Sequence, residues 1–536
     1  MSFDLPDTTT ERPPAFVTAS ACDTWLEQQA GETLVQLQAL LLRQLNLLNR
    51  YALAPAERLA IMELMRGTVH AVQTDNARRF AGKPLPLSES ETSALDTCLT
   101  IWNALANGYL HCLVAGAQDD KALAAQRAMA AMACAQFDTS RGGRMLPAGH
   151  WRKLHQAYAM AEQADVAKQE VKDELRLGRN PATPAAAWVE ALLLQCASLH
   201  ELSLRQMGWV QRWVLRWSGK LNVFASPPTM SARAIPLCVD LDSDQPAGYR
   251  PVFVSGSRFL DTSSLRSSIK KRLDLLDKGE SPKNLQLGDD CTQPQCQQVL
   301  NEMYFHWCKG GTIRRHERQG ANGTCTVIGD IEAIHYYVSG RKPFMKPNDA
   351  LTDTDIRRQR EEIATFGRVM TPHMENFTEQ HGYQMEQWDV MEEWHLVDQS
   401  ATGIRVIRAA NKRGGRFAGG QLVAVKPSDA KNLLLGVLRW VVIDPAAALQ
   451  GGIEVIAGKP TPVGVRGTGT NAIGDKYSLG FMLPEVPALN EPASIVMPVG
   501  FFRLERTLEV FSDGSAQIRL TGIIDRGADF ERATFE

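Results

Sequence analysis

The amino-acid sequence predicts a multidomain α + β protein, in which an all-α half precedes a β-rich half. Three observations lead to this fold class. The chain has 536 residues, which is too long for a single hydrophobic core. From Cys22 to about Leu221, apolar residues recur with helical spacing. After residue 310, short runs rich in β-branched residues alternate with Gly, Asn, Asp and Pro, which is typical of strands joined by turns.

The N-terminal half predicts a helical bundle or solenoid over residues 21–225, after a polar tail at residues 1–20 that we expect to be disordered. An apolar stripe in steps of three and four residues marks its first long helix: Leu34, Leu37, Leu41, Leu45 and Leu48. Later helices are expected over 121–136, 150–176 and 184–218. Such helical pairs resemble a TPR-type array, although no 34-residue repeat is evident, and surfaces of this kind usually bind proteins.

One helix of this half carries a tryptophan at every fourth position: Trp209, Trp213 and Trp217. The indoles could form an aromatic face for a partner helix, or for a membrane surface together with the nearby Arg212 and Arg216. They could equally close the helical core against the next domain, while the arginines extend outward. The three tryptophans are therefore kept as a candidate partner face beside a purely structural interpretation.

The composition changes after Ser226-Pro-Pro228, and residues 229–310 predict a mixed α/β linker domain. Its extended pieces are Ile235–Val239 and Arg250–Val254, and its helical pieces are Ser263–Leu276 and Gln295–Trp307. The β-rich half then divides into residues 311–458 and 459–536. For the last part, further strand-like runs and a Ser512-Asp-Gly-Ser turn predict a β extension or a second small β-domain.

Two polar motifs lie among the predicted strands of residues 311–458. Asp398, Ser400 and Gly403 form a D-x-S-x-x-G turn between two strands. Such a turn offers hydrogen-bonding groups to a flat polar ligand, and its glycine allows close backbone approach. The second motif, Arg314-Arg315-His316-Glu317-Arg318, directly precedes the strand-like segments 324–328 and 331–338. Arginine suits bidentate phosphate contacts and stacking on a purine.

Together, R-x-x-x-R before a first strand and D-x-S-x-x-G between later strands resemble the PilZ family of bacterial cyclic di-GMP receptors. The resemblance covers residues 311–458 and implies a small six-stranded antiparallel β-barrel with the nucleotide on its outer surface. Arg314 and Arg318 would grip phosphates and guanine, and the turn would take the other side of a guanine. The ligand-binding residues implied in this way are Arg314, Arg315, Arg318, Asp398, Ser400, Gly403 and Arg405.

The sequence departs from the family pattern in two places. Arg318 and Asp398 are 80 positions apart, and the excess is interpreted as an insertion at 339–393, with a helical segment at 355–366, that could form a lid or a partner surface beside the site. Ile313 stands where many relatives carry another arginine, so either one nucleotide or a stacked pair could bind. In the basic loop after the motif, Arg413 and Arg416 are candidate phosphate contacts if the loop leaves the same end of the barrel, or otherwise form a solvated hairpin tip.

Composition and motifs narrow the function further. A net charge of −2 gives no basis for binding a nucleic acid polymer or a membrane by bulk electrostatics. No signal peptide or membrane-spanning run is visible, and ten scattered cysteines fit a reduced, cytoplasmic protein. No catalytic, metal-binding or cofactor-binding motif is found. We therefore predict a cytoplasmic, non-catalytic cyclic di-GMP receptor that couples ligand binding to domain rearrangement and to a protein partner of the helical half. The alternative is a nucleotide-independent helical scaffold with a degenerate barrel.

Overall fold

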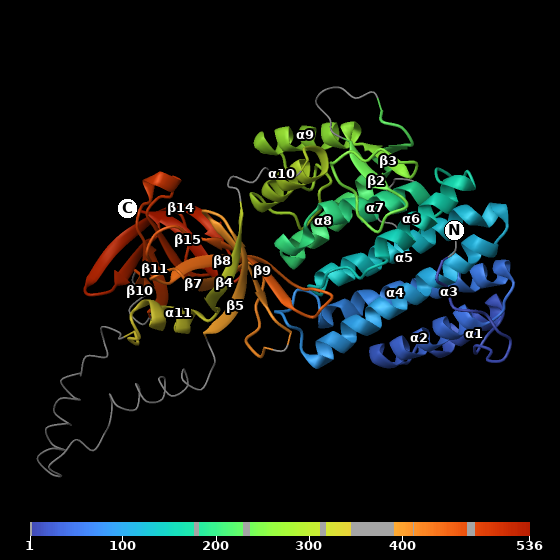
Figure 1. Ribbon diagram of the computed structural model, residues 1–536, viewed down its shortest axis with the longest axis horizontal. Helices are drawn as coiled ribbons and strands as arrows, with labels where there is room; N and C mark the ends of the chain where they lie inside the picture. Colours follow the sequence, from blue (N-terminus) through green and yellow to red (C-terminus); the bar gives the residue numbers. More distant parts are fainter. Residues whose placement is uncertain are drawn as a thin grey trace, which may run out of the picture. The chain divides into compact units, whose positions relative to one another are not determined.

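A computed structural model of the chain describes residues 3–175, 182–228, 236–310, 318–344, 391–410, 412–468 and 477–536. The chain divides into two compact units, shown in Figure 1. Unit 1 comprises residues 1–83 and 87–314, and unit 2 comprises residues 84–86 and 315–536. Unit 1 is mainly helical and unit 2 is built of β-barrels, which confirms the predicted α + β class.

The helices of unit 1 begin where their sequences provide caps. Capping boxes start the helices after Thr33, Ser88 and Ser203. Two of the expected helices are shorter than predicted, because α6 ends at Gln163 and the left-handed backbone of Ser198 separates α7 from α8. The main helices are α1 (Ala19–Gln28), α2 (Leu34–Arg50), α3 (Pro55–Asn76), α4 (Glu89–Ala115), α5 (Lys121–Arg141), α6 (His150–Gln163), α7 (Pro184–Cys196) and α8 (Leu204–Trp217).

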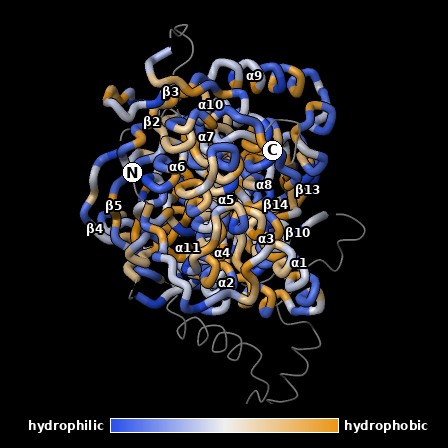
Figure 2. The backbone as a smooth tube through the Cα atoms, turned by 90° about the vertical axis from the view of Figure 1, so that its right-hand side faces the viewer, coloured by the Kyte–Doolittle hydropathy of each residue, from blue (hydrophilic) through white to orange (hydrophobic). Residues whose placement is uncertain are grey.

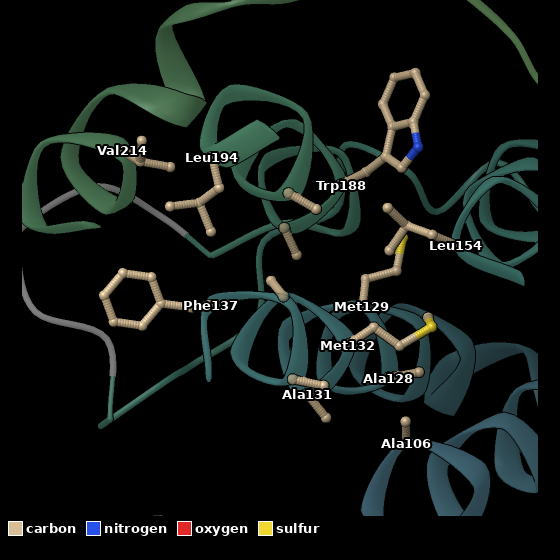
Figure 3. Packing of buried hydrophobic residues seen from close by; sticks show 14 of the residues in the cluster. Ala106, Ala128, Met129, Ala131, Met132, Phe137, Leu154, Trp188, Leu194 and Val214 are labelled. Atoms are coloured by element: carbon tan, nitrogen blue, oxygen red, sulfur yellow. The ribbon is translucent and has the colours of Figure 1, made fainter. Parts of the chain in front are cut away.

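The core of unit 1 is centred on the alanine-rich helix α5. Its small buried side chains let α4 and α7 approach closely, and hydrophobic stretches run through these helices in Figure 2. Figure 3 shows Met129 of α5 reaching toward Leu154 of α6, below Trp188 of α7. Among the described residues, no helix combines the length and apolarity that crossing a membrane requires.

The region expected to be a separate linker domain packs into the same core. Its buried side chains, such as Leu260 and Trp307, join the hydrophobic cluster of the helices. Residues 250–254, expected to be extended, lie in a loop outside the strands. The elements of this region are β2 (Leu237–Asp240), β3 (Ser257–Asp261), α9 (Ser263–Asp277) and α10 (Gln295–Cys308), and the strand β1 (Asn222–Phe224), which precedes the region, completes a sheet of order β1-β3-β2.

The N-terminal tail differs from the expectation of disorder. Phe16 is buried in the core of unit 1, and its ring contacts Trp25 at a centroid distance of 5.2 Å. The backbone of Thr9 pairs with residues on either side of Tyr51. The described part of the tail is held in place because Phe16, an aromatic residue within a polar stretch, is buried in the hydrophobic core. The composition of the tail alone does not reveal this burial.

The tryptophans of α8 are buried, so they do not form a face for a partner. Trp209 Nε1 donates to Asp290 Oδ2 at 2.9 Å, and Trp213 Nε1 donates to the carbonyl of Leu287 at 2.8 Å. Trp217 is fully buried and packs edge-on against Trp307. The indoles therefore fix the loop before α10 onto the helical core, as the structural interpretation expects.

Unit 2 contains two closed antiparallel β-barrels, each built from six of the described strands. In both, the strands follow the same spatial order, in which the first three along the chain are followed by the sixth, fifth and fourth. The predicted six-stranded barrel is thus confirmed, and the C-terminal β region is a second closed barrel. The strands of the first barrel are β4 (Gln319–Ile328), β5 (Glu392–Gln399), β6 (Gly403–Arg408), β7 (Gln421–Pro427), β8 (Leu434–Ile443) and β9 (Leu449–Val455). Those of the second are β10 (Thr461–Gly467), β11 (Ser478–Leu483), β12 (Ser494–Pro498), β13 (Thr507–Phe511), β14 (Ser515–Arg526) and β15 (Phe530–Phe535).

The segment Ile331–Val338, expected to be a strand, is the helix α11. Asp330 caps it by accepting a hydrogen bond from the backbone N–H of Ala333 at 2.9 Å. The helix buries its apolar face in a core shared by both barrels, and this packing outweighs the β-branched and aromatic composition of the segment. The shared core is lined by Ile328, Ala333, Ile334, Leu422, Ala424, Leu435, Val437, Ile456, Phe481, Leu483, Val496 and Phe530.

His335 of α11 predicts a pH dependence of the stability of unit 2. The residue is 3% exposed, and burial lowers its pKa from 6.5 to about 4. Because the folded pKa is depressed, the stability provided by the neutral ring is present above pH 6.5 and is lost as the pH falls toward 4. We expect the free energy of unfolding to fall by about 1–3 kcal/mol across this window through His335. Chemical denaturation of the parent and His335→Phe at several pH values gives the free energy of unfolding as a function of pH for each protein, and the difference between the two curves is the contribution of His335. The same pH dependence in both proteins would contradict it.

Candidate ligand-binding site on the first barrel

A β-bulge in β5 places Asp398 on the outer face of the first barrel. Leu396 pairs with Val406 of β6, but Asp398 pairs with Arg405, so Val397 is an extra residue between the two pairs. Strict alternation would put Asp398 on the same side as Leu396, which is buried inside the barrel. The bulge changes the direction of the side chain, and Asp398 faces Arg405 across the strands.

Two arginines share the carboxylate of Asp398. Arg318 Nη1 lies 2.7 Å from Oδ1, and Arg405 Nη2 lies 2.7 Å from Oδ2. The side chains of Asp398, Arg318 and Arg405 are 14%, 28% and 39% exposed, so the cluster opens to solvent mainly on its cationic side. The Nε atom of Arg405 is buried and has no hydrogen-bond partner among the described residues. Arg314 and Arg315, the other arginines of the expected site, lie outside the described residues, as does the greater part of the insertion.

The turn after β5 completes this part of the site. Its backbone is closed by a hydrogen bond from the Ser400 N–H to the Gly403 carbonyl at 2.7 Å, and the Ser400 hydroxyl approaches the same carbonyl at 3.3 Å. A Cβ at position 403 would lie 3.5 Å from Ser400 Oγ and 3.9 Å from Arg318 Nη2. Glycine therefore keeps the space between these two polar side chains open. The structure thus brings Arg318, Asp398, Ser400, Gly403 and Arg405 together.

The cross-strand register extends the site to a residue that the motif search misses. Arg405 pairs with Gly452 of β9, and Gly452 pairs with Trp440 of β8. A second bulge, at Arg439, turns Trp440 away from the side of the buried Leu438. The indole lies over Gly452, in the space that a Cβ there would fill, and it is half-buried. We call Asp398, Arg405, Gly452 and Trp440 the outer row.

The outer row combines three kinds of recognition group. Its carboxylate accepts hydrogen bonds, its arginine donates hydrogen bonds and carries positive charge, and its indole offers an aromatic surface. At the other end, Gly320 of β4 pairs with Asp398 and leaves open space where a side chain would lie. This arrangement suits an anionic ligand with a flat polar ring. In the described ranges, no group of three or more His, Cys, Asp or Glu residues could hold a metal ion.

The basic loop after β6 lies at the wrong end of the strand for a phosphate contact. The polar turn precedes Gly403, whereas the loop follows Arg408, and five residue steps along a strand span about 17 Å. Arg416 donates from Nε and Nη2 to the Pro84 carbonyl, at 3.0 and 2.8 Å, within unit 2. Arg413 is exposed on the same loop. The expectation that this loop leaves the same end of the barrel as the turn is therefore wrong, because the direction of β6 separates them.

Comparisons with known proteins match nearly the whole chain. Successive family models match residues 20–228, 237–462 and 463–536, and they describe the N-terminal domain, the middle PilZ domain and the C-terminal β-barrel domain of the cyclic-di-GMP receptor FimW. The cyclic-di-GMP receptor FimW of Pseudomonas aeruginosa is 24% identical over an alignment of 545 positions, which covers 93% of this chain and 87% of the relative. No solved structure matches the chain. The PilZ match contains the whole first barrel and its outer row, which confirms the resemblance of this region to the PilZ-domain family, whereas the second barrel matches the separate C-terminal β-barrel model.

Proposed function

We propose that the chain is a non-catalytic receptor for cyclic di-GMP, which binds on the outer face of the first barrel. The observation that carries the proposal is the convergence of Arg318 and Arg405 on Asp398, beside the Ser400–Gly403 turn. The FimW relative, whose name describes a cyclic-di-GMP receptor, supports the same ligand.

The roles of the residues follow from the chemistry of the ligand. The Watson–Crick edge of guanine carries an N1–H and an N2–H donor, which match the two acceptor oxygens of Asp398. Arg318, together with Arg314 and Arg315 of the same segment, would bind phosphates and a guanine face. Ser400 and Gly403 would shape the wall beside the guanine, since the hydroxyl is a small polar group and the glycine leaves space.

Titration of the full chain with cyclic di-GMP tests this function directly. We expect saturable binding in calorimetry and an increase in the thermal unfolding midpoint, because a ligand that binds only the folded state stabilises it. GTP at the same concentration is the control, since it carries one guanine and phosphates but lacks the cyclic dinucleotide frame. Failure of cyclic di-GMP to bind, or equal binding of GTP, would refute the proposal.

Trp440 is proposed to stack on a guanine of the ligand. Stacking of a base on an aromatic side chain contributes about 1–3 kcal/mol, so Trp440→Leu is expected to weaken cyclic di-GMP binding by roughly 5- to 100-fold. Trp440→Phe keeps an aromatic surface and is the matched control, with an expected loss of only a few-fold. Calorimetric titration measures both, and melting curves check that the barrel remains folded. Similar affinities for the leucine variant and the parent would exclude a stacking role.

Ligand binding is proposed to reorient the two units and to control a protein partner of the helical half. The connectivity of the chain supports this proposal, because the R-x-x-x-R segment crosses the boundary at which unit 1 ends and unit 2 begins. A ligand held by residues on both sides of this boundary has different affinities for different arrangements of the units, so it shifts their populations. Small-angle scattering with and without cyclic di-GMP tests the coupling, and identical profiles at saturation would argue against it.

A nucleotide-independent scaffold is the second candidate function. It is favoured by the ion pairs of the site, in which each oxygen of Asp398 has an arginine partner. In that case cyclic di-GMP would cause no thermal shift, and replacing Asp398 would affect only the stability of the barrel.

A further inference from the structure

Arg405 is paired with a carboxylate oxygen of Asp398 that guanine recognition requires. Asp398 Oδ2 is paired with Arg405 Nη2, and Oδ1 is paired with Arg318 Nη1, each at 2.7 Å. Each oxygen thus already has a charged donor. A guanine edge presents two adjacent N–H donors, and a bidentate contact with them uses both oxygens of the carboxylate. A carboxylate oxygen can accept more than one hydrogen bond, but the acceptor positions that face Arg318 and Arg405 are taken, so the ligand and the two arginines compete for the remaining room at the same two oxygens.

The two arginines differ in how they can respond to this competition. Arg318 directly precedes β4 and lies outside the backbone pairs that β4 makes with β5, so its backbone is less constrained than that of a strand residue. Arg405 lies within β6, where backbone pairs with β5 on one side and β9 on the other fix its Cα opposite Asp398 and Gly452. Its position is set by the barrel, so the pairing of Arg405 with Asp398 is a property of the fold itself.

From these contacts we propose that Arg405 is an internal counter-ion of Asp398, which guanine must displace, so that Arg405 lowers the affinity of the receptor for its ligand. The inference rests on the proposed cyclic di-GMP function and deepens it. The guanidinium takes the place of the guanine donors in the free protein and keeps the acidic turn neutralised. The affinity of the receptor for cyclic di-GMP is then limited by Arg405, on the strand next to that of Asp398.

The expected effect of removing Arg405 has a definite sign. An ion pair with this degree of exposure has a modest strength, equivalent to a factor of about two to five in binding. We expect Arg405→Met, which keeps an unbranched apolar stem of similar length, to bind cyclic di-GMP about two- to fivefold more tightly. Arg318→Ala is expected to have the opposite effect, because Arg318 is proposed to contact the bound ligand.

Loss of a positive charge would by itself weaken the binding of any anion, so the experiment must separate the two effects. Calorimetric titrations of the full chain are performed at about 0.5 M salt, where the Debye length is about 4 Å and distant charges contribute little. Arg503→Met is the matched control, since it removes one exposed cation from the segment between β12 and β13 of the second barrel, in the same unit. Its affinity should equal that of the parent.

A double-mutant cycle with Asp398 assigns the effect to the ion pair. The gain from Arg405→Met should disappear in the Asp398→Ala background, because no carboxylate remains to be released. Arg405→Met binding as tightly as the parent, or more weakly, would overturn the inference and make Arg405 a neutral residue or a direct ligand contact. Persistence of the gain without Asp398 would also overturn it. If the parent itself fails to bind cyclic di-GMP, the proposed function fails instead, so the two failures are distinguishable.

Discussion

Asp398→Ala is expected to weaken cyclic di-GMP binding by about 10- to 100-fold while the barrel stays folded. The substitution removes both acceptors proposed for the guanine edge, and a hydrogen bond to a charged group contributes about 1.5–3 kcal/mol. The stability of unit 2 should change little, because the arginines released by the substitution are 28% and 39% exposed and can be solvated in place. Calorimetric titration measures the affinity, and melting curves measure the stability.

Asp398→Asn is the informative control for this result. Asparagine keeps the size of the side chain and one acceptor oxygen but removes the charge and the second acceptor. We expect its affinity to lie between those of the parent and the alanine variant. Parent-like binding by the alanine variant would place the ligand elsewhere. A large loss of stability in both variants would show instead that Asp398 has a structural role.

Glu392→Ala is expected to reduce the stability of unit 2 by about 3–5 kcal/mol, which is the typical cost of breaking a buried ion pair. Glu392 Oε2 lies 2.6 Å from Arg408 Nη1, and these side chains are only 7% and 4% exposed. The same carboxylate accepts hydrogen bonds from Trp394 Nε1 at 3.0 Å and from the Gly415 N–H. Removing it leaves the buried Arg408 without its ion partner, although Arg408 Nη1 still donates to the Gly415 carbonyl at 3.0 Å, and it leaves the Trp394 N–H without its acceptor. Chemical denaturation measures the loss.

Replacing both Glu392 and Arg408 shows whether the loss of stability in Glu392→Ala comes from the unpaired charge or from lost packing. In Glu392→Leu with Arg408→Met, no buried charge remains, so the double variant should regain a substantial part of the stability lost in Glu392→Ala. Arg408 also lies over the rings of Trp394 and Phe417, at 5.4 and 5.8 Å, and the methionine preserves some of this contact. A double variant no more stable than Glu392→Ala would indicate that packing, not the unpaired charge, dominates the cost.

The sequence predicts the parts of the site that depend on residue type at short spacing. Asp398, Ser400 and Gly403 form one motif within six positions, and Arg318 directly precedes the first strand of its barrel. The structure brings Arg318 and Asp398 into contact across 80 positions of chain. The pairing of β4 with β5 makes this possible, because Gly320 and Asp398 are partners in the register.

The remaining parts depend on geometry that a single sequence does not display. Whether Trp440 faces the core or the solvent is decided by the bulge at Arg439, and strict alternation gives the opposite answer. The pairing of Arg405 with Asp398 depends in the same way on the bulge at Val397. The segment Ile331–Val338 has the composition of a strand, but packing between two barrels makes it a helix. Tertiary contacts determine the outcome in each of these cases.

The hydrophobic core common to α11 and the two barrels also limits how the gene can be shortened or rearranged. A premature stop codon shortly after residue 458 would leave Leu422, Leu435 and Val437 without the side chains that cover them. The shortened polypeptide would be a substrate for cellular proteases, even though every residue of the outer row would still be translated. A recombined gene that is to keep the fold of this unit should therefore carry the coding sequence of both barrels.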